Sequence, residues 1–287
     1  MKGGFKRSPG ILGFTIVEVM VFLAISGITF IIAASFISGK EAQAEYNTGM
    51  NQANLQVQTI INNVSNGNYA LPAGAALGCS FSGGRPYVTK IAPQPNNVAM
   101  EGCTFVGTVL EPNYNSSPYQ YYLYTVAGCQ NYLGAGSSYQ CSTNPRNPIP
   151  TSLEQERPEA VRWLSGSKIW DNGIGLTKIF AVEGTNWDQL SALGFFGSFP
   201  SMNSGVLESG AEPINMVYFN GTSANTAADI ASLGTSDPTG HLLTSGYVVM
   251  CFQGSKGQKG SIEIGSNVGG QQITTQKVLG QKVPSQC

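Results

Sequence analysis

The chain begins with a short basic segment and a long apolar one. Residues 1–13 carry three basic residues and no acid, and the run from Phe14 to Ile37 holds 24 residues with Glu18 as its single charge. A helix of that length reaches about 36 Å, more than the roughly 30 Å hydrocarbon core of a bilayer. The pattern predicts a membrane-spanning helix whose basic flank stays on the cytoplasmic side.

A second helical pattern follows the apolar run. Apolar residues recur at steps of three and four on a Gln- and Asn-rich background: Tyr46, Met50, Ala53, Val57, Ile60, Ile61 and Val64. Such a stripe is typical of one buried helix face. Asn66-Gly67 supplies a stop, because glycine is favoured just past a helix C-terminus. We predict one helix over residues 14–66, and we favour a domain core over a coiled-coil seam because suitably placed flanking charges are lacking.

Beyond Gly67 short apolar runs alternate with clusters of Gly, Pro, Asn and Ser, which indicates a loop-rich β structure. The predicted strands are residues 87–91, 103–110, 120–127, 179–182, 214–219, 247–253, 261–264 and 272–278. A short helix is expected over residues 152–164, and residues 246–264 predict a strand, a turn and a strand. The fold class is therefore α+β, with a long N-terminal helix packed on a C-terminal antiparallel sheet.

Charge and histidine content argue against several classes of function. The chain has 15 Lys and Arg against 16 Asp and Glu, so a generally basic nucleic-acid binder is unexpected. The single histidine, His241, lies in a turn-rich stretch with Asp237, Ser236 and Ser245, and no hydrolase, zinc-protease or calcium-loop motif surrounds it. We expect no enzyme, no metal and no cofactor. A hydrolase that is tethered by the helix and depends on His241 is the enzymatic alternative.

The cysteines predict disulfides. The six residues Cys79, Cys103, Cys129, Cys141, Cys251 and Cys287 show no C-x-x-C spacing. An even number without metal-ligand spacing indicates disulfides and an oxidising compartment, which agrees with a head outside the cytoplasm. Spacing alone leaves fifteen connectivities open.

An ordinary signal peptide is the simplest alternative for the N-terminus. Ala42-Gln43-Ala44 supplies a small-x-small cleavage site, so the product would be an exported soluble binding protein beginning at Glu45. The apolar run, however, exceeds the roughly 7–15 residues of a signal-peptide core, and Glu18 lies inside it. A carboxylate in such a segment predicts a function and a cationic partner.

The residues around Glu18 resemble a known processing site. Gly13-Phe14-Thr15-Ile16-Val17-Glu18, preceded by a basic leader and followed by the apolar run, is similar to the N-terminus of type IV prepilins and type II secretion pseudopilins. The resemblance covers about 25 residues. Many major pilins carry a proline midway through this helix, whereas this chain has none between Pro9 and Pro72. Within the apolar segment and its edge only Gly27 and Gly39 weaken the helix. The resemblance is therefore to a minor pilin or pseudopilin.

The resemblance implies roles for three residues. Gly13 would precede the bond cut by prepilin peptidase, and Phe14 would become the methylated N-terminus. Glu18 would pair with the cationic amine of Phe14 in a neighbouring subunit, since N-methylation keeps the charge of an α-amine. Glu18 extending alone to the cytoplasmic interface is the alternative.

The resemblance also implies an organisation and partners. Residues 1–13 would be the cleaved leader, 14–37 the membrane and polymerisation half of the helix, 38–66 its amphipathic half and 67–287 the head. The partners would be other pilin or pseudopilin subunits, prepilin peptidase, an inner-membrane assembly platform and membrane lipid before assembly. We expect sequence-neighbour disulfides, Cys79–Cys103, Cys129–Cys141 and Cys251–Cys287, of which the last resembles the disulfide-closed C-terminal loop of many pilins.

Three parts of the head are candidates for binding. Four tyrosines cluster on one predicted strand: Tyr119, Tyr121, Tyr122 and Tyr124. We expect half of them in the core and half on the ordinary strand surface, in preference to a platform that binds a ligand. Residues 193–200 form an apolar loop, which suits an adhesive tip or a core contact. Four lysines near the end suit a solvated hairpin edge better than a DNA contact: Lys256, Lys259, Lys277 and Lys282. A membrane-anchored surface adhesin is therefore a further alternative.

Overall fold

The computed structural model describes most of the helix and the sheet. The described residues are 15–67, 76–82, 85–91, 103–114, 118–135, 140–144, 146–148, 150, 155, 157–162, 168–197, 214–220, 230, 243, 246–265 and 273–287. The chain divides into two compact units, Met1–Glu45 and Tyr46–Cys287, and each is described by itself.

The predicted long helix is confirmed as α1, Ile16–Ser65. Gly67 follows it with φ +64°, the left-handed conformation expected of a glycine stop, and its N–H donates to the Val64 carbonyl at 3.0 Å. In the first unit α1 is long and apolar enough to cross a membrane. The hydroxyl groups of Ser26 and Ser35 donate to carbonyls four residues earlier, so these polar groups are satisfied within the helix.

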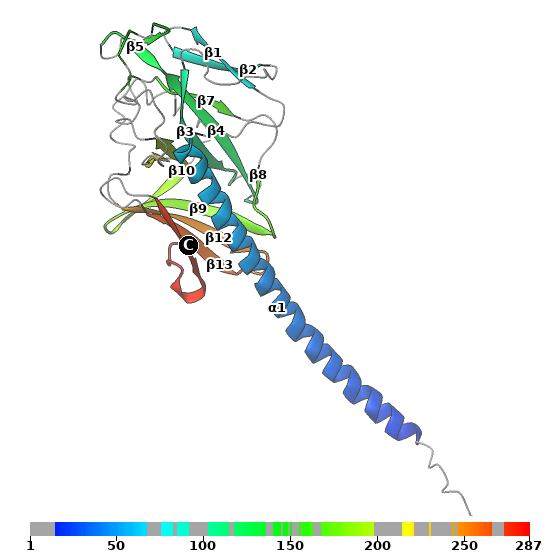
Figure 1. Ribbon diagram of the computed structural model, residues 1–287. Helices are drawn as coiled ribbons and strands as arrows, with labels where there is room; N and C mark the ends of the chain where they lie inside the picture. Colours follow the sequence, from blue (N-terminus) through cyan, green and yellow to red (C-terminus); the bar gives the residue numbers. More distant parts are fainter. Residues whose placement is uncertain are drawn as a thin grey trace, which may run out of the picture. The chain divides into compact units, whose positions relative to one another are not determined.

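Antiparallel strands make up most of the second unit, together with the part of α1 that begins at Tyr46 (Figure 1). The main sheet has the order β14-β13-β12-β9-β10-β3-β4-β7, with β11 paired to β10 and β8 paired to β4. Its strands are β3 (Cys103–Pro112), β4 (Gln120–Cys129), β7 (Glu159–Arg162), β8 (Lys168–Ile169), β9 (Ile174–Glu183), β10 (Asn186–Gly197), β11 (Ile214–Asn220), β12 (Tyr247–Gly254), β13 (Lys259–Gly265) and β14 (Thr274–Leu279). Two separate hairpins are β1 (Ala76–Ser82) with β2 (Arg85–Ile91), and β5 (Asn131–Leu133) with β6 (Gln140–Ser142).

Strand β10 joins the two halves of the main sheet. Its first residues, Asn186 to Gln189, pair with β9, whereas Leu193 to Phe196 pair with β3 on one edge and β11 on the other. A register shift within the β10–β11 pairing, between Leu190 and Ala192, falls between the residues that pair with β9 and those that pair with β3. The sheet is therefore continuous from the C-terminal strands to β4.

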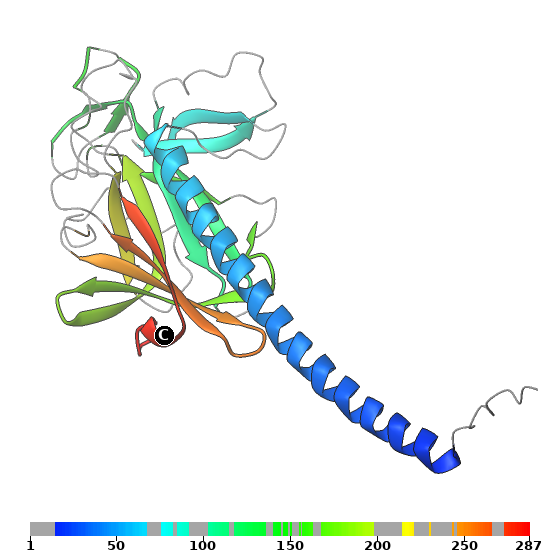
Figure 2. The ribbon, with the colours of Figure 1, turned by 60° about the horizontal axis from the view of Figure 1, so that its bottom comes forward.

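The part of α1 that belongs to the second unit lies along one face of this sheet (Figure 2). All seven residues of the predicted stripe are buried: Tyr46, Met50, Ala53, Val57, Ile60, Ile61 and Val64. They pack in one core with residues from β9, β10, β12 and β13, among them Leu176, Phe195 and Ile262. The prediction of a domain core is confirmed, because the period of the stripe matches the helix.

Polar side chains fix the same stretch of helix from both sides. On one side Gln56 Nε2 donates to Asp171 Oδ2 at 3.1 Å, and Asn172 donates to Gln52. On the other side Gln58 Nε2 donates to Thr275 Oγ1 at 2.8 Å. The residues from Tyr46 to Ser65 include no Asp, Glu, Lys, Arg or His, and their outward face is Thr48, Asn51, Leu55, Thr59 and Asn62.

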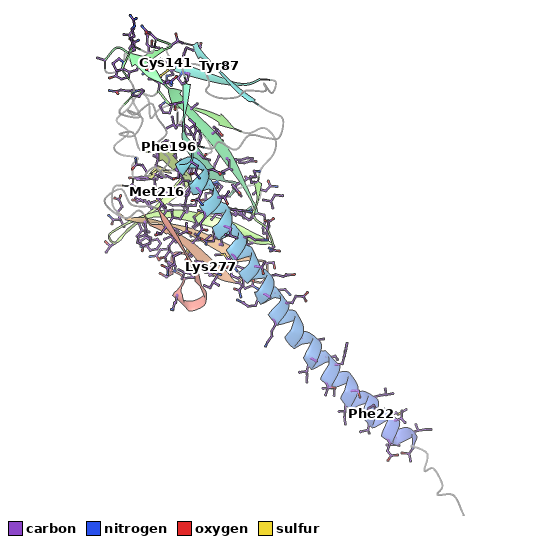
Figure 3. The ribbon with its side chains drawn as sticks, in the orientation of Figure 1. Phe22, Tyr87, Cys141, Phe196, Met216 and Lys277 are labelled. Carbon is purple, nitrogen blue, oxygen red and sulfur yellow. A yellow bond between two sulfur atoms is a disulfide. The ribbon has the colours of Figure 1, made fainter. Side chains whose placement is uncertain are left out.

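A second core covers the opposite face of β3, β4, β10 and β11. It holds Val109, Val126, Phe196 and Val217, with Ile230 against them. Figure 3 labels Phe196 and Met216 within the sheet region of the head. Both faces of these strands are thus apolar, and this hides the alternation that identifies a strand in a sequence.

All eight predicted strands are present, and one further strand lies in a segment for which we predicted a helix. Residues 159–162 form strand β7 and not part of a helix, because they pair with β4 from Tyr124↔Arg162 to Ala127↔Glu159. The strands β1, β5, β6, β8 and β10 were not predicted. The strand, turn and strand near the end are confirmed as β12 and β13.

Two of the expected disulfides are present. Cys129–Cys141 and Cys251–Cys287 have Cα–Cα distances of 5.1 and 5.3 Å. The first closes the connection from β4 to the β5–β6 hairpin, and the second ties the last residue to β12. The side chains of Cys79 and Cys103 lie outside the described part of the structure, so their pairing stays a prediction.

Candidate assembly site at the start of the helix

Thr15 and Glu18 form a reciprocal cap at the start of α1. The Thr15 N–H and hydroxyl both donate to Glu18 Oε2, at 3.0 and 2.9 Å, and the Glu18 N–H donates to Thr15 Oγ1 at 3.3 Å. This is a capping box, in which two helix-terminal N–H groups are satisfied by two side chains three residues apart. The signal was readable as Thr-x-x-Glu before an apolar run, and sequence reasoning missed it.

The cap explains how a lone carboxylate is held at this position. Its negative charge lies in the first turn, where the partial positive charge of the helix N-terminus stabilises an anion. Glu18 remains exposed, and its Oε1 has no hydrogen-bond partner among the described residues. The carboxylate is therefore positioned by Thr15 and still has an oxygen that a cation can reach. Gly13 and Phe14 lie outside the described residues.

The helix after this cap presents apolar side chains that no described residue of its own unit covers. Ile16, Phe22 and Phe30 are 76%, 71% and 74% exposed, and Figure 3 shows Phe22 pointing away from the helix. Contiguous exposed apolar surface of this kind marks a membrane or protein contact. The arrangement is an oriented charge at the beginning of a long apolar rod.

The four tyrosines of the predicted cluster do not share one surface. Tyr121 is buried, stacks on Trp170 with ring centroids 4.2 Å apart, and donates to Gln56 Oε1 at 3.4 Å. Tyr124 is buried on the other face of β4 and donates to the buried carboxylate of Glu111. Tyr122 is half-buried and only Tyr119 is exposed. The expectation of half core and half surface is confirmed.

Burial also changes the acidity of tyrosines in this unit. It raises the pKa of Tyr121 to about 12, with the nearby Asp171 carboxylate adding to the effect. Burial alone raises the pKa of Tyr46 to about 12. Both phenols are therefore neutral at physiological pH, so neither is a base or a nucleophile there.

The remaining candidates are separated in the fold. Residues 193–197 belong to β10, so the expectation of a loop was wrong for them. Leu193, Phe195 and Phe196 are fully buried, which is the core contact that was one of the two alternatives and not the adhesive tip. The reason is that β10 is apolar on both faces. Residues 198–200, His241, Asp237, Ser236 and Ser245 lie outside the described residues. No group of three His, Cys, Asp or Glu in the described ranges is placed to hold a metal ion.

The comparisons with known proteins add no family. No family model, no curated protein and no solved structure matches this chain. The assignment of a function therefore depends on the geometry above.

Proposed function

We propose that this chain is a structural subunit of a type IV pilus-like or pseudopilus filament, of the minor pilin or pseudopilin kind. The observation that carries the proposal is an exposed, capped carboxylate, Glu18, in the first turn of an uncovered apolar helix. A simple membrane tether needs the apolar helix but not the acid, which is costly in lipid.

The proposed sequence of events begins in the cytoplasmic membrane with the head outside the cytoplasm. Prepilin peptidase removes residues 1–13, and the new N-terminal amine of Phe14 is methylated and stays cationic. Partner machinery then extracts the subunit, with no reaction catalysed by the chain itself. In the filament the amine of one subunit reaches the free Oε1 of Glu18 in the next.

Assembly also requires that the apolar helices cover one another. Outside the lipid, burying one Phe or Ile side chain contributes about 1.5–3 kcal/mol. Burial of the apolar helices does not by itself fix the axial position of one subunit against the next, because one apolar surface resembles another. A charge pair that is satisfied only between correctly stacked subunits supplies the register.

The test compares two substitutions of the same residue with a substitution of its cap. Glu18→Gln keeps an acceptor for the Thr15 hydroxyl but removes the charge, whereas Thr15→Ala removes the hydroxyl of the cap and keeps the charge. We expect both variants to be processed at Phe14, and we expect Glu18→Gln and Glu18→Ala to be depleted from sheared filaments while Thr15→Ala enters them.

The readouts are the intact mass of the mature chain and its amount in the filament fraction. Normal incorporation of Glu18→Gln would contradict the charge-pairing role. A mature chain that begins at Glu45 would instead support an exported soluble binding protein, and an uncut chain would support a membrane-anchored adhesin. Loss of a hydrolytic activity in His241→Ala, with assembly intact, would support the tethered enzyme.

A further inference from the structure

Three exposed lysines gather at the end of the sheet where the head's part of α1 begins. Lys256 and Lys259 belong to the β12–β13 hairpin, and Lys282 belongs to the short helix η4 (Gly280–Lys282) that directly follows β14. The pairing Gly260↔Leu279 brings the end of β14 beside the beginning of β13, so η4 lies at the same end of the sheet as the hairpin turn.

This end of the sheet is held against Tyr46. A Cβ on Gly254 would lie 2.6 Å from Tyr46 Cδ2, and a Cβ on Gly260 would also overlap the Tyr46 side chain. Only glycine permits so close an approach, and both glycines are on the hairpin. The turn that carries Lys256 and Lys259 is therefore fixed on the first residue of the second unit.

Chain length limits how far this turn can be from the membrane. Tyr46 follows the last residue of the apolar run, Ile37, by only nine residues. Nine residues span about 30 Å when fully extended and about 14 Å when helical. If residues 14–37 cross the bilayer, as proposed above, the lysines lie within reach of the lipid headgroups.

The charges favour an anionic partner at this end. Residues 246–287 carry four Lys against one Glu, whereas residues 46–245 carry seven Lys or Arg against twelve Asp or Glu. Glu263 pairs with Gln276, three residues beyond Gly260, and so lies about 10 Å from the turn. Neither Lys256 nor Lys259 forms an ion pair with a carboxylate in the described part of the head. The sequence directly before Tyr46 carries two acidic residues, Glu41 and Glu45, and one basic residue, Lys40.

We propose that Lys256, Lys259 and Lys282 bind the phosphate groups of anionic lipids and thereby hold the head on the outer surface of the membrane before assembly. This inference rests on the proposed membrane anchor. Lipid is favoured over DNA because the proposed anchor holds the membrane near these lysines, whereas DNA would have to approach from solution against the net negative charge of the rest of the head.

The test measures how fast each lysine reacts in the full chain. The protein is placed in nanodiscs of phosphatidylcholine alone or of phosphatidylcholine with phosphatidylglycerol, and reductive methylation of each lysine is followed by mass spectrometry. We expect modification of Lys256, Lys259 and Lys282 to slow about fivefold with phosphatidylglycerol. High salt should abolish the protection, because salt screens exposed charges. Lys168, which is also exposed and belongs to β8 beside β4, on the other side of the sheet from β14, serves as the internal control and should not change.

Two double variants separate a local effect from total charge. In Lys256→Gln/Lys259→Gln the protection of Lys282 should fall. It should persist in Lys90→Gln/Lys168→Gln, which loses the same charge on strands β2 and β8. Equal rates in the two lipids, or unchanged Lys282 protection in the first variant, would overturn the proposal.

A third arm and a flotation measurement complete the design. Duplex DNA is added to the chain in phosphatidylcholine discs, and protection there without protection by phosphatidylglycerol would assign the lysines to nucleic acid and overturn the lipid proposal. Flotation with phosphatidylcholine vesicles at high salt reports the anchor separately. A chain that floats but shows no lysine protection refutes only this inference, and a chain that does not float refutes the anchor as well.

Discussion

Replacing Gly260 by alanine tests whether the head folds around the helix as described. An added Cβ would overlap the Tyr46 hydroxyl and would lie 3.0 Å from both Met50 Cε and Leu279 Cδ2. Gly265 on the same strand is the matched control, because its Cβ would meet only Thr274 Oγ1 at 3.8 Å. The two substitutions are chemically identical and differ only in what the new methyl group contacts.

The expected cost follows from overpacking a filled core. Forcing one extra carbon into such a site lowers the free energy of unfolding by about 1–3 kcal/mol. For a unit of this size each kcal/mol lowers the melting temperature by about 2–4 °C. Gly260→Ala should therefore melt clearly below the parent chain, and Gly265→Ala within about 1 kcal/mol of it. The measurement is thermal and urea unfolding of the mature chain in detergent, followed by near-UV circular dichroism.

A second substitution checks the stated cause. The Tyr46 hydroxyl is buried and has no hydrogen-bond partner in the described structure, so Tyr46→Phe alone should be neutral or slightly stabilising. In Gly260→Ala/Tyr46→Phe the hydroxyl is absent, and we expect recovery of at least about 0.5 kcal/mol relative to additivity. Strictly additive effects, or equal losses in Gly260→Ala and Gly265→Ala, would refute the described docking of helix and hairpin.

Three further predictions concern the second unit. Removing Cys251–Cys287, which spans 36 residues, should lower the free energy of unfolding by about 4 kcal/mol in the chain-entropy model. Removing Cys129–Cys141, which spans 12 residues, should lower it by about 3 kcal/mol. Urea unfolding of the two paired serine variants compares these losses. The free energy of unfolding should fall as pH rises from about 10 towards 12, because the unfolded chain then releases the proton of Tyr46 while the folded chain retains it. The urea midpoint, measured as a function of pH, should decline less steeply in Tyr46→Phe than in the parent chain. Tyr124→Phe should lower the free energy of unfolding by about 1–3 kcal/mol, because it leaves the buried Glu111 carboxylate without the phenol that donates to it. Adding Glu111→Gln to the same chain should restore part of the loss. An unchanged denaturation midpoint in Tyr124→Phe would contradict this prediction.

The helix and its buried face could be predicted because their signal is local and periodic. Seven apolar residues at steps of three and four, closed by Asn66-Gly67, identify both the face and the end without knowledge of the sheet. Strands with one polar face, such as β13, were found for the same reason. The sequence also indicates the apolar first half of the helix directly.

The missed elements depend on partners that are distant in the sequence. The apolar residues of β10 face a core on each side, and its glycines resemble loop residues; a Cβ on Gly194 would lie 3.2 Å from Val109 Cγ2 of the neighbouring β3. β7 is four residues long, and its pairing with β4 rather than local propensity decides its conformation. At the candidate site Glu18 was found from its charge, whereas the role of Thr15 required recognition of the three-residue spacing.

The stretch of α1 from Tyr46 to Ser65 contributes no charged side chain of its own to its packing. It is held by apolar contacts and by its amide groups, of which Gln56 donates to Asp171 and Asn51 accepts from Lys277. Mobile ions screen interactions between charges but leave such contacts almost untouched. Changes in ionic strength therefore leave this packing of helix on sheet nearly unchanged, whereas they act on the exposed lysines of the hairpin and on the exposed carboxylate of Glu18.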